Sequence, residues 1–390
     1  MASDVVYLDH AATTPMRPEA LEAMLPFLTE RFGNPSGSHG PARHARRAVD
    51  DARDVMAGAL GCRPGEVVFT SGGTEADNAA ITGTLACRPG AAAVAPAAEH
   101  HAVLAPVEAA GGRLVEVDAT GRVDLDALAA ALGPDVGIVS VMLANNEVGT
   151  ITPLEEVAAV VAEAAPGAVL HTDAVQALPW LDVAVAAAPA GLVSVSAHKF
   201  GGPQGVGALV VRDGTDLAPL LRGGGQERDR RSGTHNVAGI VGMAAAAGVL
   251  QRERVAQVTR VGALRDRLAD GLLAAVPDAV ETGVTGAGPD RRHHKVAGSC
   301  HLCFDGVEAE ALLFLLDTAG VCASAASSCA SGAADPSHVL AAMGLDRERA
   351  GGSLRLSLGW TTTAADVDAA LGAVPAAVAR LREPSVGGRR

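Results

Sequence analysis

Short apolar runs alternate with alanine-rich stretches along most of this chain, and this alternation limits the folds that it can adopt. The alanine-rich stretches, such as residues 154–164, place apolar residues at helical intervals. A regular alternation of strands and helices favours a mainly parallel sheet with helices on both faces. The strand-like runs lie at residues 67–69, 92–95, 114–117, 138–143, 168–170, 192–195 and 208–211. We therefore expect an α/β fold whose ligands bind beyond the carboxyl ends of the strands.

Length and charge narrow the class of protein. A chain of 390 residues is too long for one small core and suits two domains. The net charge of −13 argues against direct binding of nucleic acid. We see neither a basic segment followed by an apolar one nor an apolar run long enough to cross a bilayer. We expect a cytoplasmic protein that does not contact membranes.

Six cysteines are scattered through the chain, at positions 62, 87, 300, 303, 322 and 329. In a cytoplasmic protein of this size they do not indicate a disulfide framework. Cys300, His301 and Cys303 resemble half of a zinc site, but no second pair of ligands follows at a fitting spacing. Because residues 296–304 also have strand character, we expect no resident metal.

Polar side chains follow five of the predicted strands, at the point where each strand ends. In chain order they are residues 71–74, Glu99 and His100, Asn145 and Asn146, Asp173 and Gln176, and Ser196, His198 and Lys199. The carboxyl ends of parallel strands meet at one edge of a sheet. We therefore expect these groups to converge on one crevice.

Lys199 and Asp173 together suit a pyridoxal phosphate site. A lysine can hold the cofactor aldehyde as a Schiff base, and an aspartate can keep the ring nitrogen protonated. His100 could lie against the ring and move protons, although an isolated histidine is more often a surface or capping residue. We expect the neighbouring His101 to be structural. Asn146 could hydrogen-bond the ring oxygen, as could Gln176.

Two glycine-rich turns could bind a phosphate. Residues 71–75 precede a predicted helix over residues 76–81, whose first free amides can bind an anion. The alternative is an ordinary helix with Thr74 as its N-cap. Residues 223–228 lead into residues 231–234 (RSGT), which suit either a phosphate or a flexible basic loop.

The C-terminal part of the chain supplies a thiol and a guanidinium. Every residue from 324 to 334 is small, and Cys329 lies among them. Such a loop could carry a nucleophile, although a buried cysteine is the alternative, and for Cys322 we favour burial. Residues 353–359 alternate like a strand and contain Arg355. This arginine could clamp a substrate carboxylate, and it needs a partner to justify its charge among apolar residues.

With these motifs in order, the chain resembles cysteine desulfurases of the NifS/IscS type, which are class V aminotransferases of PLP fold-type I. The resemblance covers nearly the whole length. It rests on residues 7–15, 33–36, 70–78, 99–100, 145–149, 172–176, 194–202, 223–234, 329–339 and 353–359. It implies a mainly parallel seven-stranded sheet between helices, plus a smaller α+β domain. The large cofactor-binding domain would span residues 15–255, and residues 1–14 and 256–390 would form the small one.

The resemblance also assigns the cofactor contacts. Lys199 matches the lysine that binds the aldehyde, Asp173 the partner of the ring nitrogen, and Gln176 the residue at the ring hydroxyl. His100 matches the histidine stacked on the ring and is a catalytic candidate with Lys199. The matches to phosphate ligands are Gly73, Thr74, Ser196, His198 and, donated by the other subunit, Thr234. A homodimer with shared active sites is thereby implied.

The implied reaction converts L-cysteine to L-alanine and leaves sulfur on Cys329 as a persulfide. Asn34 and Arg355 match contacts to the substrate carboxylate, and Asn146 matches an asparagine near the ring and substrate. The sulfur would pass to an iron–sulfur scaffold, a tRNA thiolase or a sulfur carrier. Cys329 could also ligate an iron–sulfur cluster transiently.

Three departures from the family pattern affect these expectations. Ala326 and Ser328 stand where glycine and alanine are usual, and Gln226 replaces a common histidine. The chain stops at residue 390 without the long extension that housekeeping members use to dock a scaffold, which favours other acceptors. A selenocysteine lyase or another class V enzyme is the alternative function. A non-catalytic binding platform is disfavoured, because it would be expected to lose Lys199, Asp173 or Cys329, and all three are present.

Overall fold

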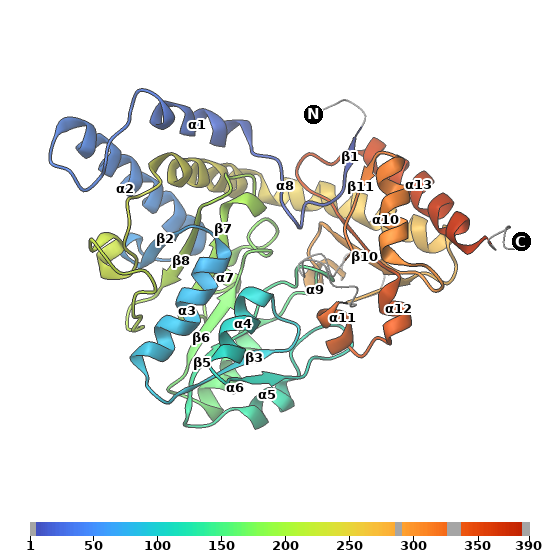
Figure 1. The fold of residues 1–390 in the computed structure, drawn as a ribbon, viewed down its shortest axis with the longest axis horizontal. Helices are drawn as coiled ribbons and strands as arrows, with labels where there is room; N and C mark the ends of the chain where they lie inside the picture. The colour runs from blue at the N-terminus through green and yellow to red at the C-terminus, as the bar shows by residue number, and fades with distance from the viewer. Residues whose placement is uncertain (1–4, 285–290, 326–336, 384–390) are drawn as a thin grey trace, which may run out of the picture.

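The computed structural model describes residues 5–284, 291–325 and 337–383. Its first half builds a large sheet covered by helices, and its C-terminal part builds a smaller sheet beside it (Figure 1). Cys329, Ala326 and Ser328 lie outside the described residues.

The large sheet has seven strands in the order β2-β8-β7-β6-β5-β3-β4. Only β8 is antiparallel to its neighbours, so the sheet is mainly parallel, as the sequence predicts. The predicted run over 138–143 is shorter as a strand, because it leaves the ladder after Ser140. The strands are β2 (Val67–Thr70), β3 (Ala92–Pro96), β4 (Arg113–Val115), β5 (Val136–Ser140), β6 (Val169–Asp173), β7 (Leu192–Ser196) and β8 (Gly207–Val211).

Helices cover both faces of this sheet. On one face, α3 and α4 pack through Ala76, Ala80 and Val103 against side chains such as Ala93 of β3. On the other face, α2, α5, α6, α7 and the first half of α8 form the main apolar core. The helices are α1 (Pro18–Leu28), α2 (Gly40–Leu60), α3 (Gly73–Cys87), α4 (His101–Ala109), α5 (Leu125–Ala131), α6 (Leu154–Ala164), α7 (Val183–Ala186) and α8 (Val237–Ala275).

The C-terminal part has its own core. Strands β9 (Val280–Glu281), β10 (Ser299–Cys303) and β12 (Ser353–Ser357) form an antiparallel sheet in the order β12-β10-β9. The chain's first strand, β1 (Val6–Tyr7), pairs in parallel with β11 (Val321–Cys322), which brings the N-terminal segment to this part. The helices are α9 (Arg291–His294), α10 (Ala309–Thr318), α11 (His338–Ala342), α12 (Arg347–Gly351) and α13 (Ala364–Arg382).

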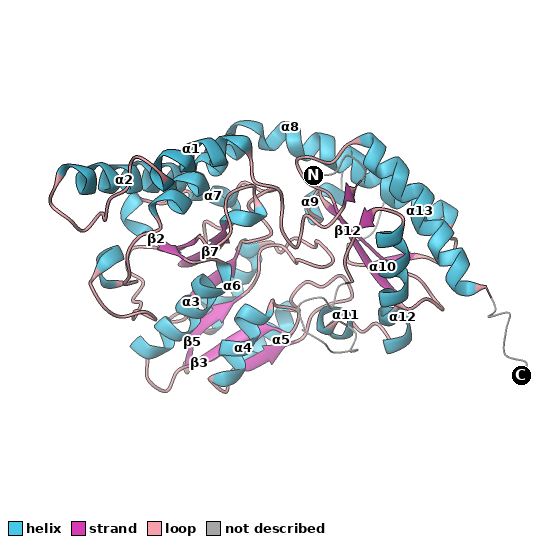
Figure 2. Ribbon diagram, turned by 45° about the horizontal axis from the view of Figure 1, so that its top comes forward, coloured by secondary structure: helices cyan, strands magenta, loops and turns pink. Residues whose placement is uncertain are grey.

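Helix α8 joins the two cores. It runs from α1 and α2 to α13 (Figure 2), with Leu250 in the first core and Leu268 in the second. The predicted boundary between residues 255 and 256 falls inside this continuous helix.

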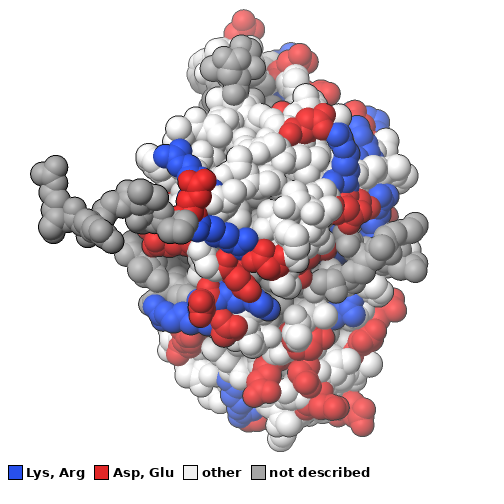
Figure 3. Space-filling model, turned by 90° about the vertical axis from the view of Figure 1, so that its right-hand side faces the viewer, with Lys and Arg blue, Asp and Glu red and all other residues white. Residues whose placement is uncertain are grey.

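The outer face of the C-terminal part carries basic and acidic side chains side by side (Figure 3), including the ion pairs Arg382–Asp278 and Arg349–Asp305. Among the helices of the described ranges, none is both long and apolar enough to cross a membrane.

Candidate active site

A cavity of about 330 Å³ lies beyond the carboxyl ends of the parallel strands, between the two parts of the molecule. The structure brings most of the predicted site residues into its lining. These are Gly73, Thr74, His100, Asn146, Asp173, Gln176, Ser196, His198, Lys199 and Arg355. The expectation of one crevice therefore holds for residues that follow five different strands of the large sheet, and Arg355 of the C-terminal part joins them.

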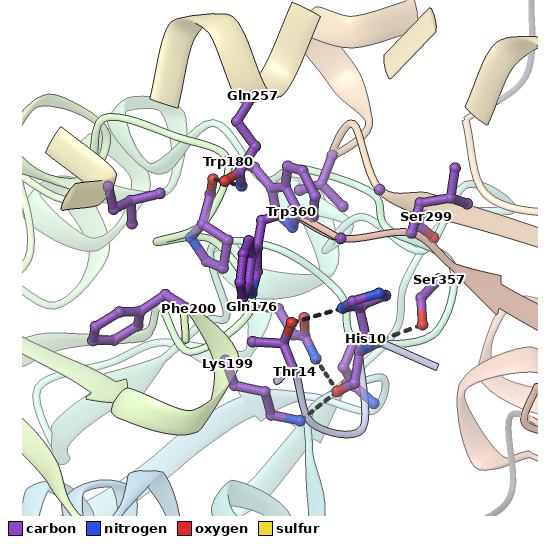
Figure 4. A pocket seen from close by; sticks show the side chains of 18 of the residues that line it. His10, Thr14, Gln176, Trp180, Lys199, Phe200, Gln257, Ser299, Ser357 and Trp360 are labelled. Atoms are coloured by element: carbon purple, nitrogen blue, oxygen red, sulfur yellow. Dashed lines mark hydrogen bonds between the residues drawn. The ribbon is translucent and has the colours of Figure 1, made fainter. Parts of the chain in front are cut away.

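Lys199 ends the 3-10 turn η2 (Ala197–Lys199), directly after β7. Its ammonium donates to the carbonyl oxygens of Ala11 and, at 2.9 Å, of Ala12. The Gln176 amide donates to the same Ala11 oxygen at 2.7 Å, and Figure 4 shows both side chains pointing at that carbonyl. The N-terminal segment thus crosses the cavity beside the lysine, where sequence patterns gave no reason to place it.

Asp173 ends β6 and is buried at the cavity wall. Its carboxylate accepts a hydrogen bond of 2.8 Å from the amide of Val175. Burial raises the pKa of Asp173 to about 6, while the nearby Lys199 charge lowers it. The carboxylate is therefore the predominant form at neutral pH, as a partner for a protonated ring nitrogen requires.

A second buried acid, Asp77 of α3, also lines the cavity and was missed from the sequence. Burial and the Asp173 charge raise the pKa of Asp77 well above its ordinary value. Its carboxylate lies 3.6 Å from His171, whose ring nitrogens contact Ser140 and Ser194. A charged residue among the small apolar residues of α3 was the available signal.

The cavity histidines are neutral. Burial, with the Lys199 charge, lowers the pKa of His100 to about 4 and that of His198 to about 4. His100 also accepts a hydrogen bond of 3.1 Å from the Ala102 amide, so it caps α4 while it lines the cavity. His101 lies outside the lining and packs against the ring of His338 at 4.4 Å between centroids.

The turn after β2 leaves backbone amides uncovered at the start of α3. The N-cap is Gly72, without any capping side chain, so Thr74 lies inside the helix and is not its N-cap. The helix begins at Gly73, three residues earlier than predicted. A Cβ atom on Gly73 would lie 2.8 Å from a methyl group of Val175, so any larger residue there would have to displace that side chain. Open amides at a helix start form an anion site.

Arg355 lies in the middle of β12, where its buried side chain pairs with Asp9 at 3.0 Å. A second hydrogen bond of 3.1 Å runs from its guanidinium to the carbonyl oxygen of Asn146. Asp9 is the partner that the charge needs, and it comes from the far end of the chain. Within the described part of the chain, the Arg355 Nε and Asn146 Oδ1 atoms are buried without hydrogen-bond partners.

Two predicted site residues lie away from this cavity. Asn34 follows α1, and its side chain accepts a hydrogen bond of 3.0 Å from the Ser36 amide. Thr234 is exposed in the loop of residues 223–235. Gln226 of the same loop, which replaces a common histidine, accepts a hydrogen bond of 2.9 Å from the Gly233 amide. Ser324, close before the segment that contains Cys329, does line the cavity.

Comparison with known proteins identifies the family. The protein-family model described as "Aminotransferase class-V" matches residues 6–370 of the chain. The chain belongs to this family. It is 47% identical over 98% of both chains to an IscS-like cysteine desulfurase of Mycobacterium tuberculosis. A solved NifS-like protein superimposes with a TM-score of 0.87 at 34% identity, over 96% of this chain and all of the other. A structure described as SspA in complex with cysteine gives 0.74 at 29% identity, over 90% and 98%.

Class V aminotransferases depend on pyridoxal 5'-phosphate, and this cavity fits that cofactor. The open amides at Gly73 suit its phosphate, the Asp173 carboxylate suits its ring nitrogen, and Lys199 suits its aldehyde. The buried Asn146 Oδ1 leaves an acceptor for a ligand. The cavity volume lies in the range of small-molecule sites.

Proposed function

We propose that this chain is a pyridoxal-phosphate-dependent cysteine desulfurase that converts L-cysteine to L-alanine. The observation that carries the proposal is the meeting of Lys199, Asp173, His100 and Arg355 in one cavity. These groups come from both parts of the molecule, and together they suit a cofactor and an amino-acid substrate. The cysteine desulfurases among the relatives support the same reaction.

The proposed cofactor contacts divide by chemistry. Lys199 would hold the aldehyde, Asp173 the ring nitrogen and Gln176 the ring hydroxyl, and His100 would contact the ring. The phosphate contacts are Gly73, Thr74, Ser196 and His198. When bound, the ring supplies an electron sink for negative charge at the substrate Cα.

The chain's own groups then orient the substrate and move its protons. Arg355 binds the substrate carboxylate through its guanidinium fork, with Asn146 beside it. The amine of Lys199 would be the base for the Cα proton. His100 is neutral, and because its Nδ1 accepts from the Ala102 amide, its other ring nitrogen carries the hydrogen and can donate a hydrogen bond into the cavity.

We assign the sulfur-transfer step to Cys329. Its thiolate attacks the substrate sulfur, so that an S–S bond forms while the Cβ–S bond breaks. The electron pair left on Cβ takes up a proton, and the product is alanine. Cys329 then holds a persulfide, and the sum of the reaction needs no outside oxidant or reductant.

Several finer features belong to this proposal. The working unit is a homodimer in which Thr234 of one copy reaches the phosphate of the other, and Asn34 contacts substrate in the assembled site. Residues 15–255 act as the cofactor-binding unit, and residues 1–14 with 256–390 form the unit that carries Cys329. The persulfide sulfur passes to an acceptor in the cytoplasm, either an iron–sulfur scaffold, a tRNA thiolase or a sulfur carrier. In this account Cys329 could also hold a cluster transiently.

The test follows the visible absorbance of cofactor-loaded protein while L-cysteine is added, with alanine and sulfide measured in the same sample. We expect the band to shift, and alanine to form in the wild type but not in Cys329→Ser. A shifting band without alanine would move the substrate to selenocysteine or another amino acid. The absence of a visible band would refute the cofactor assignment.

A further inference from the structure

The loop of residues 223–235 is an exposed segment with an unusual backbone. Glu227, Arg228 and Asp229 have φ values of 48°, 57° and 63°, so three consecutive non-glycine residues lie in the left-handed region. Each such residue costs free energy, and the conformation persists only where the surroundings impose it. The neighbouring Gly225 is also left-handed, at 71°.

A buried ion network imposes this conformation. Glu227 is buried and accepts two hydrogen bonds of 2.7 Å from Arg53 of α2. The amide of Phe69 in β2 donates to the same carboxylate at 2.9 Å, and His235 contacts it at 2.6 Å. Burial would raise the pKa of Glu227, but the Arg53 and His235 hydrogen bonds lower it to about 2. The carboxylate is thus charged, and it ties the loop to α2, to β2 and to the loop's own C-terminal end at His235.

The same loop is tied to the phosphate turn of its own chain. Arg231 donates to Glu75 at 2.9 Å and 3.3 Å, and Glu75 accepts from the Ser71 amide at 2.8 Å. Glu75 directly follows Thr74, which lines the cavity. A rigid chain of contacts therefore runs from the phosphate turn to the loop.

The tip of the loop nevertheless lies outside the lining of that cavity. Gly233 and Thr234 are exposed, and neither lines the cavity of its own chain. The need for fold stability does not readily explain the buried Arg53–Glu227 ion pair beneath this exposed tip, because a buried ion pair contributes little net stability. It is well suited to preorganising a group that must meet a second molecule.

We propose that Glu227 is a positioning residue that acts in trans: it holds the loop in the shape in which Thr234 completes the cofactor site of a second copy of this chain. Arg53 and His235 fix Glu227, and Arg231 links the loop to the phosphate turn of its own chain. The inference rests on the proposed homodimer, and it adds the residues that preform the shared part of the site.

The test is complementation between two defective chains. Glu227→Gln keeps the side-chain shape and removes the charge, and as a homodimer it should bind pyridoxal phosphate about tenfold more weakly, the loss of one charge-assisted hydrogen bond. A heterodimer of Lys199→Ala and Glu227→Gln chains is isolated with two affinity tags. Its one lysine-containing site meets an intact loop from the Lys199→Ala chain. We expect that site to regain wild-type cofactor affinity, read from the visible band, and about half of the wild-type activity per dimer.

If Glu227 acted only within its own chain, the heterodimer would stay as defective as the Glu227→Gln homodimer, and the inference would fall. His235→Ala is the second variant, should Glu227→Gln not fold, because it leaves the Arg53 pair in place. It should complement Lys199→Ala in the same way. Glu66→Gln is the matched control, since Glu66 also pairs with an arginine near β2 but does not contact the loop. Its cofactor affinity should equal that of the wild type.

A heterodimer of Lys199→Ala with Thr234→Val distinguishes failure of the Glu227 role from failure of the shared site. If it recovers while the Glu227→Gln and His235→Ala heterodimers do not, only the role of Glu227 is refuted. If it does not recover, or if the wild-type chain is a monomer, the shared site itself is refuted and this inference falls with it.

Discussion

The two sides of the cavity differ in how burial acts on their ionisable groups. On the side of the large sheet, burial raises the pKa values of Asp77 and Asp173 and lowers those of His100 and His198. On the side of the small sheet, Arg355 is charged and paired with Asp9. The large-sheet side is therefore suited to proton chemistry around a cofactor, while the small-sheet side is suited to binding a carboxylate.

The two sides of the cavity also differ in how far apart their residues lie along the sequence. The groups of the large sheet lie at successive strand ends, so one topology places them together. Arg355 lies within a strand, and its partner Asp9 is 346 residues away in the chain. The substrate side thus depends on the pairing of the N-terminal segment with β11 and β12.

The largest effect is expected at Lys199, to which we assign both the cofactor aldehyde and the Cα proton. Lys199→Ala should lower the rate of alanine formation by about 10²–10⁴-fold through loss of the base alone. The change should also abolish covalent cofactor attachment, which mass spectrometry after borohydride reduction reads directly. Attachment at another lysine would contradict the assignment of the sheet side.

Arg355 tests the small-sheet side of the cavity. Arg355→Met should raise the KM for L-cysteine by about 10–100-fold, because one charge-assisted contact to the carboxylate is lost. The cofactor band should remain, since the sheet side is untouched. Arg355→Lys keeps the positive charge but loses the bidentate guanidinium geometry, so its KM should lie between those of the wild type and Arg355→Met. An unchanged KM in Arg355→Met would remove Arg355 from the substrate site.

Asp173 tests the large-sheet side of the cavity through its pH dependence. Its pKa of about 6 means that the carboxylate gains a proton as the pH falls through this value. Cofactor affinity of the wild type should therefore decrease below about pH 6, while Asp173→Asn should bind weakly and without this pH dependence. The range from pH 5 to 8 extends roughly one unit or more on either side of the pKa of Asp173. A cofactor affinity of the wild type that stays constant over this range would contradict the assignment of Asp173 to the ring nitrogen.

The same pKa predicts a stability difference in the cofactor-free protein. In the unfolded chain the pKa of Asp173 is near 3.8, but in the folded chain it is near 6, so ionisation opposes folding above pH 3.8. Asp173→Asn should equal the wild type below that pH and exceed it above pH 6, by up to about 3 kcal/mol in the free energy of unfolding. Denaturant titrations at both pH values measure this difference.

The smallest effect is expected at His101. It lies outside the cavity lining and contacts His338, so His101→Gln should change activity by less than about twofold, as surface substitutions usually do. His100→Gln is the matched comparison, and it should reduce turnover clearly. Equal losses in the two variants would show that local packing, rather than position at the cavity, explains the role of His100.

Sequence reasoning succeeded where backbone topology alone decides position. The seven strands and the convergence of their end groups followed from the apolar pattern, and α6 has the predicted bounds. Asp77 and the Ala11 carbonyl escaped it, because their places depend on how α3 and the N-terminal segment pack. The network around Glu227 was equally hidden, since Arg53 and Glu227 are 174 residues apart and meet only in the folded chain.

The most direct test of the account is mass spectrometry of the intact, cofactor-loaded protein after a single turnover with L-cysteine, followed by digestion to locate the added sulfur. The account predicts one extra sulfur atom per active site on Cys329, one alanine released for each, and neither product in Lys199→Ala. Alanine formed while the sulfur is absent from the protein, or carried by a cysteine other than Cys329, would contradict it.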